Sequence, residues 1–115
     1  MTFHETNKRA AIYWQGVLLR NGIAATRKGS KLHAGEIHTY AVRARSAGTR
    51  RSVNVKSNDL KCDYLLMHFA FEDTPVELFK VPMQVVDALA GLEQSHGRTL
   101  HARDVEQYAI KVRKF

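Results

Sequence analysis

The stretch that decides the fold is His38-Thr-Tyr-Ala-Val-Arg-Ala-Arg-Ser-Ala-Gly-Thr-Arg-Arg-Ser-Val-Asn-Val-Lys56. Its side chains alternate along residues 36–45 and again along 52–57, as they do in β-strands. The Ser46-Ala-Gly-Thr49 segment between them is typical of a tight turn. The stretch therefore predicts two strands that pair as a β-hairpin, with basic side chains flanking the turn.

Ahead of this hairpin, apolar residues recur at helical spacing. Ala10, Trp14 and Leu18 lie on one face, and Asn21-Gly22 is a typical helix stop. The pattern predicts a helix from about Thr6 to Asn21. The following residues, 23–35, contain the basic run Arg27-Lys-Gly-Ser-Lys31 and are typical of a solvated loop.

Behind the hairpin, Tyr64-Leu-Leu-Met-His-Phe-Ala-Phe71 is a continuous apolar run of strand length, which predicts a central strand buried on both faces. Residues 76–81 alternate and predict another strand, which Pro82 ends. Helices are expected over 83–94 and 102–112. This order predicts one domain over residues 1–115 in the α/β (α+β) class, with a small mixed sheet flanked by helices.

The charge of the chain is unusual for its size. Lysine and arginine number 18 against 11 aspartates and glutamates, which gives a net charge of +7. Such a domain is a candidate for binding the phosphate backbone of nucleic acid, whereas the alternative is a solvated strand surface protected by charge from edge pairing. The candidate phosphate-binding residues are Lys28, Lys31, Arg43, Arg45, Arg50 and Arg51.

Cysteine usage and the N-terminal segment set further bounds. The single cysteine, Cys62, excludes an internal disulfide and a cysteine-based zinc site. The first residues have no apolar signal core, and no apolar run reaches the length of a membrane span. We therefore expect a cytoplasmic protein with no membrane partner.

Four short motifs, taken in order, carry a family resemblance over about residues 6–90. They are Leu19-Arg-Asn-Gly22, Val53-Asn-Val-Lys56-Ser57, Cys62-Asp-Tyr-Leu-Leu-Met67 and Leu78-Phe-Lys-Val-Pro82. The chain thereby resembles the PD-(D/E)XK nuclease superfamily, in its Holliday-junction-resolvase-like branch. The resemblance implies a restriction-endonuclease-like fold and a phosphodiesterase site, in which acidic side chains hold Mg²⁺ or Mn²⁺ and a lysine stabilises charge near the attacking water.

Carried over residue by residue, the motif gives an altered site. Lys56 matches the family's lysine, and Asn54 stands where the family has a second acidic residue or glutamine. The first acid would fall within 38–41, where this chain has none. Glu36 could take its place as catalytic residue and metal ligand, and His38 is a second candidate ligand.

Three functions follow from this reading. The first is a nucleic-acid-binding protein with DNA as its partner, a degenerate metal site, and Lys56 and the arginines on phosphates. The second is an active Mg²⁺- or Mn²⁺-dependent endonuclease that uses Glu36, Asn54 and Lys56. The third is a non-catalytic protein-interaction module of the immunity or inhibitor type. Members of this fold often dimerise, and the C-terminal helices would supply apolar surface for a homodimer.

Overall fold

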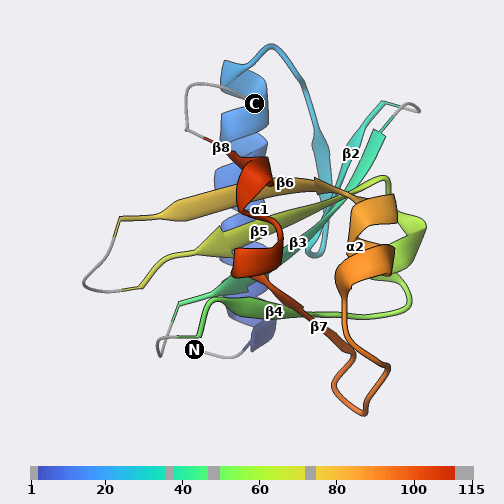
Figure 1. Ribbon diagram of the computed structural model, residues 1–115. Coiled ribbons are helices and arrows are strands. Elements are labelled where there is room, and N and C mark those ends of the chain that lie inside the picture. The colour runs from blue at the N-terminus through green and yellow to red at the C-terminus, as the bar shows by residue number, and fades with distance from the viewer. Residues whose placement is uncertain (1–2, 36–37, 47–49, 72–74, 111–115) are drawn as a thin grey trace.

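Strand β5 (Tyr64–Phe69) lies at the centre of the main sheet (Figure 1). The computed structural model describes residues 3–35, 38–46, 50–71 and 75–110. In it, β5 pairs in parallel with β3 (His38–Arg45) and antiparallel with β6 (Glu77–Pro82). All of β5 after Tyr64 is buried. The prediction of a central strand covered on both faces is therefore confirmed.

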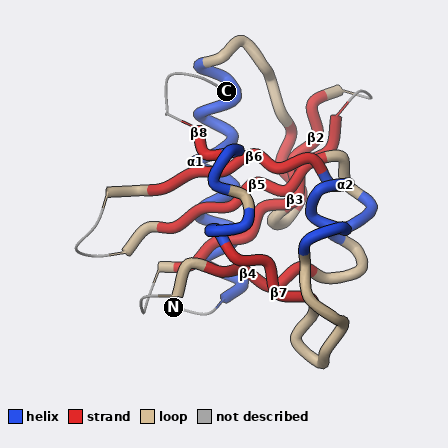
Figure 2. Tube along the Cα trace, in the orientation of Figure 1, coloured by secondary structure: helices blue, strands red, loops and turns tan. Residues whose placement is uncertain are grey.

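The described residues form two sheets (Figure 2). The main sheet has the strand order β1-β2-β3-β5-β6-β8, and β4 and β7 form a separate two-stranded ribbon. The predicted class, a mixed sheet flanked by helices, is confirmed. The other elements are α1 (Phe3–Arg20), β1 (Thr26–Lys28), β2 (Lys31–Ala34), β4 (Ser52–Val55), the 3-10 turn η1 (Asp59–Lys61), α2 (Met83–Leu89), β7 (Arg98–His101), the 3-10 turns η2 (Ala102–Asp104) and η3 (Glu106–Tyr108), and β8 (Ala109–Ile110).

The main sheet separates two hydrophobic cores. Helix α1 covers one face, where Trp14 and Leu18 pack with Leu66 of β5 (Figure 1). The β4–β7 ribbon and α2 cover the opposite face, where Val55 packs with Met67. Because successive side chains of a strand point to opposite faces, the central strands β3, β5 and β6 contribute to both cores. Burial on both sides explains why the central strands are so continuously apolar.

The predicted hairpin between residues 38–45 and 52–57 is wrong in its pairing. Strand β3 is an interior strand, since β2 pairs with it over 38–41 and β5 over 40–45. Strand β4 instead pairs antiparallel with β7, with Val53 opposite Leu100. The reason is burial: Tyr40, Ala41 and Val42 are all buried, so β3 needs a neighbouring strand on each edge.

The predicted loop over 23–35 contains a short hairpin instead. Strands β1 and β2 pair antiparallel around Gly29, whose φ of +64° suits a residue without a side chain. Strand β2 then pairs with β3 and extends the main sheet at that edge. Lys28 and Lys31 flank the turn, so the basic run is held in a defined conformation.

The predicted helix over 83–94 ends early, at Leu89. Ala90 is already extended, with φ −67° and ψ 146°. The guanidinium of Arg98 donates to the backbone oxygens of Asp87 and Ala90, which satisfies carbonyls at the end of α2. The chain then turns at Gly97, where an added Cβ would lie 2.7 Å from the carbonyl oxygen of Val55. This close approach lets β7 pair with β4.

The predicted helix over 102–112 is also wrong within its described part. Residues 102–110 form the turns η2 and η3 and the short strand β8, which pairs with β6 at Leu78 and Phe79. Val105 is buried against the main sheet, so its spacing reflects a packed turn and not a helical face. The apolar helix on which the homodimer prediction rested is therefore not formed over 102–110. No helix within the described ranges is long and apolar enough to cross a membrane.

One buried carboxylate, Asp59, links the two sheets. Its side chain is 1% exposed. Arg43 Nε donates to Oδ2 at 2.8 Å and Arg43 Nη2 donates to Oδ1 at 3.1 Å. Lys31 Nζ lies 3.5 Å from Oδ1, and the backbone N–H of Lys56 donates to Oδ2 at 2.9 Å. Asp59 therefore joins β2, β3 and the end of β4.

We expect Asp59→Asn to lower the free energy of unfolding by about 3 kcal/mol, because it leaves Arg43 uncompensated in a largely buried position. Urea denaturation followed by tryptophan fluorescence of Trp14 measures this change. The control is Asp104→Asn, which removes an exposed carboxylate. Equal stability of the two variants would contradict the linking role of Asp59.

Candidate nucleic-acid interface

The structure brings four of the predicted site residues into one pocket. Arg43 and Arg45 come from the end of β3, Asn54 from β4, and Lys56 directly follows β4. We call this hollow of about 200 Å³ the arginine pocket. Its lining residues are Asn7, Arg43, Ala44, Arg45, Val53, Asn54, Lys56 and His96.

The arginine pocket has a defined geometry because its walls are held by hydrogen bonds. Asn7 of α1 accepts a hydrogen bond from the backbone N–H of Ala44 at 2.9 Å, which fixes the helix against the end of β3. Arg45 Nε donates to the carbonyl oxygen of Ser52 at 3.0 Å, which fixes β4 against β3. Arg43 is held by Asp59. The side chain of Lys56 is exposed and forms no ion pair with a described residue.

A second basic hollow includes Lys31, the other basic side chain that Asp59 contacts. This lysine pocket, of about 520 Å³, is lined by Lys28 and Lys31 of the β1–β2 hairpin and by Lys61 of η1. Its remaining lining residues are His33, Thr39, Asn58 and Cys62. Burial raises the pKa of the Cys62 thiol, so that side chain stays neutral near pH 7.

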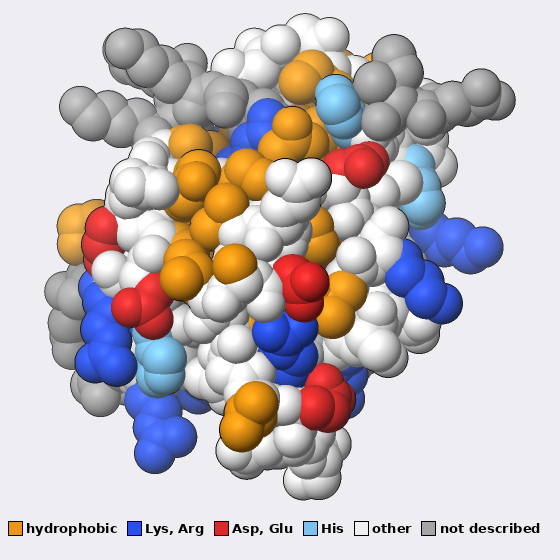
Figure 3. Space-filling model, turned by 45° about the vertical axis from the view of Figure 1, so that its right-hand side comes forward, with side chains coloured by type: hydrophobic (Ala, Val, Ile, Leu, Met, Phe, Trp, Pro, Cys, Tyr) orange, Lys and Arg blue, Asp and Glu red, His pale blue; other side chains and the backbone are white. Residues whose placement is uncertain are grey.

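Among the described residues, no acidic side chain lines either basic pocket. Asp59 contacts a basic residue of each, Arg43 in one and Lys31 in the other, and it is nearly inaccessible itself. It therefore offsets part of the local positive charge, whereas the exposed Lys28, Lys56 and Lys61 form no ion pair within the described ranges. By contrast, the face in Figure 3 shows acidic and basic side chains interspersed around hydrophobic ones.

The other predicted arginines lie differently. Arg51 pairs with Glu77 at 2.6 Å and with Glu106 at 2.7 Å, and these hydrogen bonds raise the pKa of its guanidinium. Its role in the described structure is to attach β4 to β6 and η3. Arg50 is exposed and lines neither basic pocket. Of the four arginines flanking the predicted turn, Arg43 and Arg45 are therefore the two that reach the pocket.

Glu36 lies outside the described residues, and His38 lies away from the arginine pocket. His38 begins β3 whereas Arg45 ends it, a separation of about 23 Å at the rise of a strand. The ring of His38 packs edge-on against Tyr64, with centroids 5.6 Å apart. Both residues line a different cleft.

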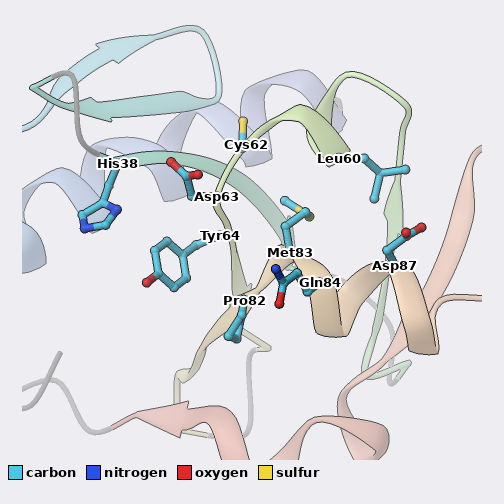
Figure 4. A pocket seen from close by; sticks show the side chains of 9 residues that line it. All are labelled: His38, Leu60, Cys62, Asp63, Tyr64, Pro82, Met83, Gln84 and Asp87. Atoms are coloured by element: carbon cyan, nitrogen blue, oxygen red, sulfur yellow. The ribbon is translucent and has the colours of Figure 1, made fainter.

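That cleft, of about 620 Å³, lies beside the start of α2 (Figure 4). Its two carboxylates come from different sides: Asp63 lies next to His38, and Asp87 lies on α2 (Figure 4). Asp63 Oδ2 accepts hydrogen bonds from the backbone N–H of Thr39 and from its hydroxyl, whereas Asp87 pairs with Arg98 at 2.6 Å. Both carboxylates thus hold elements of the fold together.

The described residues contain no group of three or more histidine, cysteine, aspartate or glutamate side chains placed to hold a metal ion. Asp59 is the acid nearest in sequence to Lys56, but its oxygens already accept hydrogen bonds from Arg43 and from the backbone N–H of Lys56. The Asp59 oxygens are therefore already engaged within the fold.

Sequence reasoning missed Asp59, although it leaves a local signal. In Lys56-Ser57-Asn58-Asp59 an acid stands three residues after Lys56, which is the spacing of the acidic half of a capping box at a helix start. The Asp59 carboxylate does reach back to the Lys56 N–H, and the Lys56 carbonyl accepts from the Asp59 N–H at 2.9 Å. Asn7, His96 and Lys61 have no such signal, because their places depend on contacts distant in sequence.

Comparison with known proteins assigns no family. No protein-family model matches the chain, and no curated protein matches it. A solved structure titled "Crystal Structure of MepB" is similar over 89% of this chain and 95% of its own, with 12% sequence identity and a TM-score of 0.45. A likeness this distant supports no argument about fold or function. The resemblance to the PD-(D/E)XK superfamily stays a prediction.

A buried histidine lies on the face of the main sheet that α1 covers. His68 of β5 is 8% exposed and faces α1, where its ring meets Tyr13 edge-on at 5.0 Å. Burial lowers the pKa of His68 to about 4, so the ring is neutral at pH 7.

This shift makes stability depend on pH. Between about pH 6.5 and 4 the unfolded chain binds a proton at His68 that the folded chain does not, so stability is full above pH 6.5 and falls as the pH is lowered. We expect a loss of up to about 3 kcal/mol over this window. In His68→Phe this contribution should vanish, whereas His96→Gln, an exposed histidine, should retain it. An unchanged pH profile in His68→Phe would refute the assignment.

Proposed function

We propose that this protein binds nucleic acid, with DNA as the first candidate, through the phosphate backbone. The observation that carries the proposal is the pair of basic pockets that each have a cation held by Asp59, with no acidic residue among their described lining residues. A phosphate chain that passes over both would meet basic residues of β1, β2, β3 and η1, and Lys56 just after β4. The net charge of +7 favours the same partner over distances beyond direct contact.

The side chains present in the two pockets suit phosphate. Arginine offers planar N–H groups that bind two phosphate oxygens, and lysine offers a compact charge. Lys56 and Lys61 are exposed, and neither is in an ion pair with a described residue. The amide of Asn54 can donate to a phosphate oxygen without adding charge. These contacts position a backbone but do not distinguish bases.

Asp59 holds two of the basic side chains in place before any nucleic acid binds. Arg43 and Lys31 would otherwise repel each other at close range, and the shared carboxylate fixes both against the sheet. The cost of ordering these long side chains is then met during folding and not on binding. Binding by this arrangement needs no metal ion, and so differs from the endonuclease alternative, whose candidate ligand Glu36 lies outside the described residues.

We expect the affinity for a short DNA to fall steeply between about 50 and 200 mM salt. Replacing Lys56 and Lys61 together by glutamine should weaken binding and lower the slope of log K against log salt by about 2, since each lost phosphate contact removes about one released counterion. Fluorescence anisotropy at several salt concentrations measures both quantities. The loss should be similar for oligonucleotides of unrelated sequence.

The matched control is Arg20→Gln with Arg103→Gln, which removes the same charge at exposed positions outside both pockets. It should change the slope much less. Equal losses of affinity in the two double variants would show that binding depends on net charge alone, which would contradict the proposed pockets. Absence of salt-sensitive binding in the unaltered protein would refute nucleic-acid binding altogether.

A further inference from the structure

A third hollow, the histidine pocket, opens where the parallel strands β3 and β5 end. It has a volume of about 300 Å³, within the range of small-ligand sites. Arg45 and Ser46 line it at the end of β3, His68 and Ala70 line it at the end of β5, and α1 closes the other side. The residues that α1 contributes are Thr6, Arg9, Ala10 and Tyr13. In open parallel α/β sheets, ligands bind outside the carboxyl ends of the strands, and this pocket has the same place relative to the one parallel pair of the described sheet.

His68 gives this pocket an unused polar group. The residue is 8% exposed, and its Nδ1 is buried with no hydrogen-bond partner among the described residues. Buried polar atoms are nearly always paired, so an unpaired one calls for an explanation. Here the ring lines a hollow whose walls are mostly apolar, and a ligand with a complementary polar edge would supply the missing partner after a small rotation of the ring.

Tyr13 adds a stacking surface. The residue is 38% exposed, and its ring meets His68 edge-on with an interplanar angle of 87°. Two aromatic rings at right angles leave a planar guest a face to stack on and an edge to meet. An aliphatic guest would fill the volume but would leave His68 Nδ1 unpaired. A flat heterocycle with polar edges fits both features.

The histidine pocket adjoins the arginine pocket. Ala44 and Arg45 line both hollows, which lie on opposite faces of the sheet and meet at the end of β3. Arg9 adds a second cation at the rim of the histidine pocket. A nucleotide bound there would therefore have a place for its ring beside His68 and a cation for its phosphate at Arg45.

We propose that the histidine pocket receives an unpaired base of the bound strand, stacked on Tyr13 and hydrogen-bonded to His68, while Arg45 contacts the adjoining phosphate. This inference rests on the proposed function, because the arginine and lysine pockets would bind the phosphates of the same strand. It adds a preference for single-stranded or locally opened nucleic acid. Base–aromatic stacking of this kind tolerates any base, so the preference concerns strandedness and not sequence.

The test compares two single strands of about ten nucleotides, a usual size for one such domain, of which one is intact and the other abasic along its length. Both carry the same phosphates. We expect the abasic strand to bind about tenfold more weakly to the unaltered protein at low salt, as measured by fluorescence anisotropy. We also expect a 2-aminopurine base in the intact strand to change its emission on binding.

Two variants locate the effect. Tyr13→Ala and His68→Phe should each reduce the preference for the intact strand, with the salt dependence of binding unchanged. Ile12→Ala is the matched control, because Ile12 is the exposed neighbour of Tyr13 and lines a different groove. It should retain the full preference. Tyr13 is partly exposed, so Tyr13→Ala keeps the test valid even if His68→Phe fails to fold.

The outcomes separate the two proposals. Salt-sensitive binding with equal affinity for intact and abasic strands would overturn base binding in the histidine pocket. It would leave phosphate binding by the arginine and lysine pockets intact. A preference that persists unchanged in Tyr13→Ala would place the base elsewhere and also overturn it. Absence of salt-sensitive binding to either strand would overturn both proposals.

Discussion

The structure depends on the burial of one carboxylate, Asp59, among basic groups. A buried charge of this kind is tolerated only when it is paired and hydrogen-bonded, and here Arg43, Lys31 and the Lys56 N–H meet that demand. Because these partners come from β2, β3 and the end of β4, the carboxylate fixes the ribbon against the main sheet. It also places the arginine and lysine pockets side by side, so one interaction serves both the fold and the proposed binding surface.

The alternation of side chains along β3 then determines which residues face each side of the main sheet. Arg43 and Arg45 share the face toward β4, as the period of two in the sequence indicates. The side chain of Ala44 packs on the α1 side, and its backbone N–H donates to Asn7. The arginine and histidine pockets consequently meet at the end of one strand from its two faces. A nucleotide has the same division, with a charged phosphate at one end and a flat ring at the other.

Much of this fold could be predicted from local pattern, but its pairing could not. Helix α1 and strands β5 and β6 have strong periodicity or long apolar runs, which tertiary contacts did not override. The partner of β4 depends on Gly97 approaching Val55 and on Arg98 ending α2, contacts between segments far apart in sequence. The shared face of Arg43 and Arg45 was predictable from strand parity. Their meeting with Asn54 and Lys56 was not, because β3 and β4 do not pair, and Asp59 required knowledge of what surrounds it.

The most direct test of the account is a nuclear magnetic resonance titration of the labelled protein with a short single-stranded DNA. The account predicts that the amide resonances of Arg45, Asn54, Lys56 and Lys61 shift together and saturate at one concentration. Those of Gln84 and Asp87, in the cleft beside α2, should stay in place. Shifts confined to that cleft, or no shifts at low salt, would contradict it.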